Sequence, residues 1–430
     1  MTTFVLDLND TELRIGRGGR ALVSAPGYAV LADEAVLFGR DAIKQFRVNP
    51  RRATNQFWHR LSLDPLPARV GAVASHADLV YRHLRALTAE AEIGPGDELI
   101  VAAPATTTNE QLSLLLGITE QIGVRVTGLV DAGLAGTASV DLPDRFVHLD
   151  VALHRATATR IENGEALARV GSSEIPELSL SALLDSWMGA VSDRFVRETR
   201  FDPLTSADTE QQIYNQIYEW LARGASDAVL AIELKHRASV RRVELASSGL
   251  LERAQSLYRV ADRALDGAPI VLSHRAAALP GLVDRLAQRG AAVTIATPTA
   301  LFESVERHSR VIRSDPQALK LVTRLPARGT AARSATRRAS PTHVLWNAQA
   351  VPIGTGVRLS RAVFGDLPNG FPDDALAIAP QQDDVRLSLA PGSAASIDGA
   401  PARDGARLSN GAEIELAGLR FRLIRVIDAL

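Results

Sequence analysis

The chain has 430 residues, 46% of them hydrophobic and 23% charged, so it is long enough for two or three domains with buried cores. A formal net charge of −1 argues against a chain-wide nucleic-acid or membrane-surface role, and the absence of cysteine excludes disulfides, thiolate zinc sites and thiol nucleophiles. No run reaches the ~18 apolar residues of a membrane-spanning helix, and no signal-peptide pattern precedes the first predicted strand, so we expect a cytoplasmic protein without a membrane span.

Two segments of similar pattern, Val5–Ile15 and His148–Ile161, each predict a buried strand, a turn and a second strand. The first strand of each pair ends in an acid, Asp7 or Asp150. The turns between the strands read Asn9-Asp10-Thr11 and Ala152-Leu153-His154-Arg155. Acids at such positions commonly cap the turn that follows a strand, and this is one interpretation of Asp7 and Asp150.

Strands and helices alternate through roughly the first 325 residues, which predicts an α/β domain. Leu99–Ala103 is a short apolar run that predicts a buried strand, and Thr108–Gly123 has the apolar spacing of a helix that ends at glycine. Asp131 follows the strand predicted at Val124–Val130 and is placed to cap a small-residue helix. The later predicted elements are helices at Leu178–Thr199, Ser206–Arg223, Gly249–Leu265 and Leu279–Gln288, a hairpin of Ala228–Leu234 and Val240–Leu245, and strands at Pro269–Leu272 and Ala292–Ile295.

The sequence changes character at 326–342, a stretch rich in Ala, Arg, Ser and Thr whose lack of hydrophobic periodicity is typical of a linker. No acidic residue occurs from Pro316 to Gly365, while basic residues gather over 320–338: Lys320, Arg324, Arg328, Arg333, Arg337 and Arg338. These charges either keep a solvated tether extended or contact an acidic partner, nucleic acid or an anionic lipid surface. No aromatic residues interleave the arginines, and the chain carries no specific nucleic-acid motif.

Residues 343–430 show the pattern of short strands and tight turns, and we expect a small β-sandwich. Asp398-Gly399 and Asn410-Gly411 are both strong signals for two-residue hairpins. The closing run Glu413–Ile427 alternates apolar and polar residues, as half-buried strands do. The predicted organisation is therefore an α/β domain over 1–325, a linker over 326–342 and a β-sandwich over 343–430.

In motif order and character, the first 325 residues resemble the nucleotide-binding domain of DnaK-type heat-shock chaperones, a branch of the actin and sugar-kinase fold. Phe38–Arg60 is similar to the family stretch containing Gly-x-x-Ala, Asn-Pro and Lys-Arg-Leu, and Asp185–Leu204 resembles the helix that ends in Phe-x-x-x-x-Gly-Ile-Asp-Leu. Further similar stretches are Ile100–Pro104, Thr127–Ala135, Val243–Arg253 and Ile270–Leu286. The resemblance implies a two-lobed, DnaK-like actin-type ATPase fold, with the two predicted turns in the places of its phosphate-binding hairpins.

The resemblance also implies where functional residues should lie. Asp7 and Asp150 match the two acids that face the metal of bound Mg-ATP or Mg-ADP. His59 stands where the family has the lysine that assists the attacking water, and Asp131 stands at the position of its base-like glutamate. If a nucleotide binds, the resemblance places around it Asp7, Asn9, Asp10, Thr11, Asp150, His154, Arg155, Ser273 and Arg275.

The phosphate-binding motifs are nevertheless degenerate. The family fills its two turns with Gly and Thr so that phosphate can approach bare backbone N–H groups, and those residues are largely replaced here. Asp10 lies where the family has a threonine that donates to a phosphate oxygen. Its carboxylate would repel the phosphate, because two unit charges ~4 Å apart repel by ~4 kcal/mol at an effective dielectric of about 20. Side chains of Ser273–Ala277 replace a glycine-rich adenosine motif and should intrude. A neutral His59 supplies little of the positive charge that phosphoryl transfer needs. Because these motifs are degenerate, we expect no resident cofactor.

The tail, Ser396–Val426, resembles the last third of a forkhead-associated β-sandwich. In that family a phosphothreonine pocket needs an arginine after an early glycine, together with a Ser-x-x-His loop. Ser360-Arg361 is a candidate remnant of the first feature, and the second is missing. We therefore expect a plain interaction module rather than a phosphopeptide reader.

Three hypotheses follow. The leading one is a DnaK-like pseudo-ATPase that acts as a scaffold or adaptor for an unidentified protein partner. The second is a divergent ATP-dependent chaperone that still binds and slowly hydrolyses ATP, and the third is an actin-like assembly protein with a phosphoprotein-binding tail. No H-E-x-x-H, G-x-S-x-G or P-loop signature supports a different enzyme, and the pair His148 and His154 is more often structural than metallic.

Overall fold

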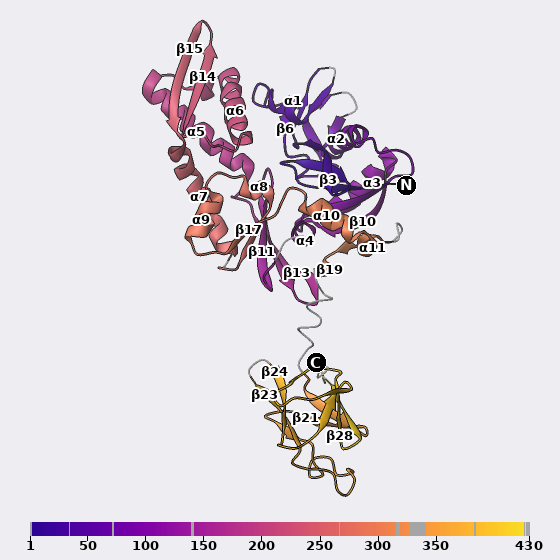
Figure 1. Ribbon diagram of the computed structural model, residues 1–430. Helices are drawn as coiled ribbons and strands as arrows, with labels where there is room; N and C mark the ends of the chain where they lie inside the picture. Colours follow the sequence, from indigo (N-terminus) through magenta and orange to yellow (C-terminus); the bar gives the residue numbers. More distant parts are fainter. Residues whose placement is uncertain are drawn as a thin grey trace. The chain divides into compact units, whose positions relative to one another are not determined.

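The computed structural model describes residues 2–33, 35–70, 73–138, 142–265, 267–314, 319–326, 341–381, 384–424 and 426 (Figure 1). The chain splits into two compact units, Met1–Arg328 and Gly329–Leu430. Most of the predicted linker, residues 327–340, lies outside the described residues, and with it the arginines at 328, 333, 337 and 338. The protein is a mixed α/β chain in which helices occur only in the first unit, as far as the described residues show.

The first large sheet of the first unit has the order β18-β10-β9-β1-β2-β3. Strands β1, β2 and β3 form an antiparallel meander, while β9 and β10 add in parallel on the other side of β1. Its strands are β1 (Thr3–Asp7), β2 (Leu13–Arg17), β3 (Arg20–Ala25), β9 (Glu98–Ala103), β10 (Arg125–Asp131) and β18 (Leu321–Val322). Strand β9 is buried along its whole length, as its continuous apolar sequence predicts for a central strand.

The second large sheet repeats this arrangement. Its order is β17-β16-β11-β12-β13-β19, with an antiparallel meander of β11, β12 and β13 and with β16 and β17 added in parallel beside β11. Its strands are β11 (Arg145–Val151), β12 (Ala156–Asn163), β13 (Ala166–Ile175), β16 (Ile270–Leu272), β17 (Val293–Ile295) and β19 (Arg324–Pro326). Strands β1 and β11 therefore hold equivalent places, and each carries its acid near its carboxyl end.

Helices flank these sheets and confirm the predicted pattern. Thr108 caps helix α3 through a reciprocal capping box, and Gly123 ends it with the left-handed conformation that glycine adopts most readily. The helices are α1 (Gly39–Ile43), α2 (His76–Glu90), α3 (Asn109–Ile122), α4 (Ala132–Thr137), α5 (Leu180–Thr199), α6 (Ala207–Ala222), α7 (Ser247–Leu265), α8 (His274–Ala277), α9 (Leu282–Gln288), α10 (Ala300–Arg307) and α11 (Ser309–Ile312), with a 3-10 turn at Pro203–Thr205.

Two insertions extend the first unit. Between β3 and β9 lie α1, α2 and the short strands β4 (Ala29–Leu31), β5 (Val36–Phe38), β6 (Ala53–Thr54), β7 (Pro65–Val70) and β8 (Val73–Ser75). Between β13 and β16 lie α5, α6, α7 and the predicted hairpin, which the structure confirms as β14 (Val229–His236) and β15 (Ser239–Ala246). One hydrophobic core joins the two insertions, because Tyr28 and Ile43 of the first pack with Ile213, Tyr214 and Ile217 of the second.

The second unit contains two antiparallel sheets that share one hydrophobic core around Phe364, Leu387 and Phe421. One sheet has the order β21-β20-β29-β28-β25-β26, and the other has the order β22-β23-β24-β27. The strands are β20 (His343–Trp346), β21 (Gln349–Pro352), β22 (Val357–Arg358), β23 (Leu376–Gln381), β24 (Asp384–Leu389), β25 (Ala395–Ile397), β26 (Ala400–Pro401), β27 (Arg407–Leu408), β28 (Glu413–Leu416) and β29 (Leu419–Ile424).

One of the two predicted hairpin turns in this unit is confirmed and the other is wrong. Asp398-Gly399 joins the paired strands β25 and β26, and both residues have positive φ, as a two-residue hairpin turn requires. Asn410-Gly411 instead lies between β27 and β28, which belong to different sheets. Gly411 does have a positive φ, so the dipeptide makes a turn, but this turn passes the chain from one sheet to the other.

Candidate functional site

The turns that follow β1 and β11 hydrogen-bond directly to each other. Asp10 Oδ1 accepts the backbone N–H of Leu153 at 2.7 Å, and Asn9 Nδ2 donates to Val151 O at 3.1 Å and to Asp150 Oδ2 at 3.0 Å. A backbone N–H of the second turn is thus already satisfied by a carboxylate of the first. A phosphate that bound here would have to displace the Asp10 carboxylate from the backbone N–H of Leu153.

Asp10 is nearly inaccessible to solvent. Burial raises the pKa of its carboxyl, although the Leu153 N–H and the neighbouring His154 and Arg155 act in the opposite direction. The first turn is further fixed by Thr11, whose N–H and hydroxyl both donate to Asn9 Oδ1, at 3.0 and 2.7 Å. The turn therefore satisfies its own polar groups without a ligand.

Two arginines and two aspartates form a buried network behind these turns, which we call the Asp–Arg network: Asp7, Arg14, Asp150 and Arg275. Arg275 Nη1 donates to Asp7 Oδ2 at 2.8 Å, and its Nη2 and Nε donate to the two oxygens of Asp150 at 2.9 and 3.2 Å. Arg14 Nη2 donates to Asp7 Oδ2 at 2.6 Å. The guanidinium of Arg275 therefore occupies the space between the two acids that the resemblance assigns to a metal-bound nucleotide.

The electrostatics of the Asp–Arg network are balanced internally. Burial by itself raises the pKa of Asp7 and of Asp150, but their partners together outweigh it. Arg275 acts on both acids, with Arg14 at Asp7 and with His148 and Ser273 at Asp150, so both pKa values lie below their usual range. Burial lowers the pKa of Arg275, yet Asp150 and Asp7 outweigh it and raise that pKa. Two carboxylates and two guanidiniums thus compensate one another at neutral pH.

Ser273 supports this network from the start of α8. Its hydroxyl donates to Asp150 Oδ1 and accepts the N–H of Ala276 at 3.0 Å, so one side chain caps the helix and orients the acid. Neighbouring His274 faces Glu12 at 3.3 Å. Within the described ranges, no three His, Asp or Glu side chains gather closely enough to hold a metal ion.

The two residues at the family's catalytic positions have other partners. Asp131 caps α4, because its Oδ1 accepts the N–H of Leu134 at 2.9 Å, and its Oδ2 pairs with Arg169 at 2.7 Å. The capping interpretation of Asp131 is therefore confirmed. His59 lies beside His154, with ring centroids 5.4 Å apart, and burial, Arg155 and His154 lower its pKa to about 4, so it is neutral at pH 7.

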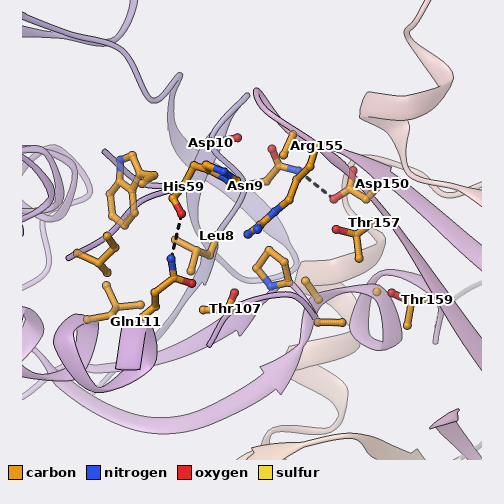
Figure 2. Close-up of a pocket in the computed structure, with 18 of the residues that line it drawn as sticks. Leu8, Asn9, Asp10, His59, Thr107, Gln111, Asp150, Arg155, Thr157 and Thr159 are labelled. Atoms are coloured by element: carbon orange, nitrogen blue, oxygen red, sulfur yellow. Dashed lines mark hydrogen bonds between the residues drawn. The ribbon is translucent and has the colours of Figure 1, made fainter. Parts of the chain in front are cut away.

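A small pocket lies between the two turns and the start of α3 (Figure 2). Asn9 and Asp10 line it from one side, and Asp150, Arg155 and Thr157 line it from the other. Its volume is about 60 Å³, whereas small-molecule sites usually enclose about 300–1,000 Å³. His154 Nε2 contacts Asn55 O at 3.0 Å, and Arg155 pairs with Glu174 at 3.4 Å, so the two basic residues of the turn are also engaged within the chain.

Polar contacts tie the two insertions together beyond this pocket. The hydroxyls of Tyr28 and Tyr214 lie 2.7 Å apart and fully buried. Gln211 of α6 donates to Ile43 O at 2.8 Å and accepts the N–H of Arg47 at 2.6 Å. No sequence pattern indicates these contacts, because each joins residues more than 160 positions apart.

In the second unit, Arg361 is also engaged within the chain. Its Nε and Nη2 donate to Asp373 Oδ2 at 3.0 and 2.9 Å, and its backbone N–H donates to Asp373 Oδ1 at 2.6 Å. A phosphopeptide at this turn would have to compete with that carboxylate.

Comparison with known proteins adds no assignment. No protein-family model matches the chain, and a search of curated proteins returns no match. Among the described residues, no helix combines the length and apolar character needed to cross a bilayer. The functional argument therefore rests on the contacts described above.

Proposed function

We propose that the first unit is a DnaK-like pseudo-ATPase with the actin-type fold, and that the protein acts as a scaffold or adaptor in protein interactions. The observation that carries this proposal is the position of Arg275, which bridges Asp7 and Asp150 at 2.8 and 2.9 Å. A guanidinium held in this way takes both the space and the charge partners that a magnesium nucleotide would need.

The repeated sheet architecture supports the fold assignment. Both large sheets place a three-stranded meander beside two parallel strands, and both first strands carry an acid as the last or last-but-one residue before a tight turn. Such a duplication with two facing hairpin turns is what a two-lobed actin-type domain requires. Fold alone does not give function, so the proposal depends on the chemistry of the turns.

The energetics also disfavour nucleotide binding. A nucleotide would have to break several charge-assisted hydrogen bonds of the Asp–Arg network and the contact from Leu153 to Asp10. Buried carboxylates that lose their cation carry a penalty of several kcal/mol. Bound magnesium would bring two positive charges, but the phosphates of the nucleotide offset them, and Arg275 would have to leave its salt bridges with Asp7 and Asp150.

The test is calorimetric titration of the full chain with Mg-ATP and with Mg-ADP, each to about 5 mM, with a DnaK-type chaperone as positive control. We expect no binding heat for this protein. Micromolar binding would contradict the proposal and return the ATP-dependent chaperone to first place. An Arg275→Ala variant run in parallel shows whether the guanidinium alone blocks the site, because binding would then appear only in the variant.

A further inference from the structure

The β14–β15 hairpin is a two-stranded sheet whose two edges differ in their hydrogen-bond partners. The hairpin stands beside α6, at the end of the first unit opposite β13 and β19 (Figure 1). One face packs Leu230, Ile232, Leu234 and Val243 into the core, and the other face is exposed. Each edge of such a sheet presents backbone N–H and C=O groups that need partners.

Two glutamines of α6 seal the edge of β14. Gln216 accepts the N–H of Glu233 at 3.1 Å and donates to Glu233 O at 2.9 Å. Gln212, one helical turn earlier, accepts the N–H of Lys235 at 2.8 Å and donates to Lys235 O at 2.9 Å. Each side-chain amide therefore pairs with the strand as a neighbouring backbone would, and the β14 edge is covered at Glu233 and Lys235.

These contacts also establish which backbone groups of β15 point outward. Glu233 and Lys235 lie opposite Arg242 and Val240, and they direct their backbone groups away from β15. In an antiparallel pair both members of such a position point outward, and the pattern alternates, so Glu244 also points outward. In the part of the chain that the structure describes, nothing hydrogen-bonds to the outward backbone groups of Val240, Arg242 and Glu244. The side chains of these three residues are exposed.

We propose that β15 pairs with β15 of a second copy of this chain, antiparallel and about a two-fold axis at Val243. In this register Arg242 faces Glu244 of the second copy, and Val240 faces its Ala246. Every outward residue then meets an outward residue, so backbone hydrogen bonds form along the whole contact. The two hairpins together make a continuous four-stranded sheet with a self-complementary interface.

The charge pattern selects the second copy as occupant and also selects the register. Arg242 and Glu244 lie on the same exposed face and pair with each other at 2.9 Å in the single chain. A symmetric partner centred at Val243 replaces the two intrachain contacts, one in each copy, with two cross-strand Arg–Glu pairs, which are favourable in antiparallel sheets. A symmetric partner centred at Arg242 would place two arginines opposite each other, which is unfavourable.

Sedimentation velocity of the full chain, from about 1 to 300 µM, tests the proposal, because edge pairing of this size belongs to the weak class of interfaces. We expect a monomer–dimer equilibrium. Arg242→Glu and Glu244→Arg, each alone, should weaken dimerisation by about tenfold or more, because like charges then face each other. Arg259→Glu, a reversal at an exposed position of α7, should leave it unchanged.

Mixing the two single variants provides the decisive measurement. The Arg242→Glu variant carries glutamate at both paired positions, and the Glu244→Arg variant carries arginine at both. Opposite charges then meet at both cross-strand pairs, so the mixture should form heterodimers more tightly than either variant forms homodimers. A chain that stays monomeric at every concentration would overturn the proposal, and so would a dimer insensitive to Arg242→Glu. Failure of the mixture to associate would overturn the register and with it the pairing that we propose.

Discussion

Replacing Arg275 by methionine tests whether the Asp–Arg network holds the first unit together. Methionine keeps an unbranched stem and removes the guanidinium, so Asp150 loses its contacts at 2.9 and 3.2 Å while Asp7 keeps Arg14 at 2.6 Å. Removing one partner of a buried ion pair costs about 3–5 kcal/mol. Because Asp7 keeps one guanidinium, we expect the lower end, a decrease of about 3 kcal/mol in the free energy of unfolding at pH 7.5.

The decrease should depend on pH in a defined direction. In the wild type burial raises the pKa of Asp150, but Arg275, with smaller contributions from His148 and Ser273, outweighs it, so the folded-state pKa lies below the unfolded value of about 4. Its stabilising contribution is present above that value and is lost only as the pH falls through the folded-state pKa. In the variant burial acts without Arg275 and raises the pKa of Asp150. Protonation then relieves part of the penalty, so the deficit should shrink between pH 7.5 and 5.0.

Urea unfolding followed by fluorescence measures this, since Trp187 and Trp220 are buried in the first unit with ring centroids 5.3 Å apart. Arg259→Met, at an exposed site on α7, is the control and should change the free energy of unfolding by less than about 0.5 kcal/mol. A loss below about 1 kcal/mol at pH 7.5, or an equal loss at both pH values, would refute the reasoning.

Three further predictions concern buried polar groups. Tyr28→Phe removes one hydroxyl of a buried pair and should lower the free energy of unfolding by about 1 kcal/mol in urea titrations, whereas no change would mean that the pair is not formed. Burial lowers the pKa of His83 to about 3, so the wild type should lose about 1.4 kcal/mol from this residue as the pH falls from 7.5 to 5.5, and His83→Asn should show a correspondingly shallower slope. Asp10→Asn keeps an oxygen acceptor for Leu153 and removes a buried charge whose pKa burial raises; thermal unfolding should therefore favour the variant at pH 8, with a gain that vanishes toward pH 4. A variant less stable than wild type at pH 8 would show that the charge itself is required.

Elements of the first unit could be predicted because their signals are local. Thr108 and Gly123 mark the two ends of α3 through capping chemistry that needs no distant partner. The alternation across Ala228–Leu245 predicts the β14–β15 hairpin for the same reason, and Asp131 at the start of α4 follows the rule for helix caps. Each of these depends on residues within a few positions of one another.

The decisive contacts of the site could not be predicted in this way. Arg275 reaches Asp150 from 125 positions away and Asp7 from 268, and no sequence rule sets that convergence. Arg14 carried no such signal either, because a charged residue between Leu13 and Ile15 fits the alternation of a half-buried strand and predicts an exposed side chain. The structure instead buries Arg14, where its charge is paired with Asp7.

The Asn410-Gly411 prediction failed for a related reason. The dipeptide predicts a tight turn, but the strands on either side pair with partners chosen by the packing of the whole sandwich. In the same unit Ala417-Gly418 makes a true two-residue hairpin between β28 and β29, with positive φ at both residues, although alanine is not a typical residue for this turn. Turn residues thus predict where the chain reverses direction, whereas the packing of the core determines which strands pair.

The buried contact between Tyr28 and Tyr214, together with Gln211 on Ile43 and Arg47, has a consequence for recognition. A protein that must close before it binds loses affinity in proportion to the fraction of molecules that are still open. Here the two insertions are already joined by a shared core, so a partner that bound their outer surfaces would not have to bring them together first, and its affinity would not be reduced by that step. The same contacts leave a ligand little opportunity to alter that affinity by shifting populations, because a ligand can shift only states that coexist.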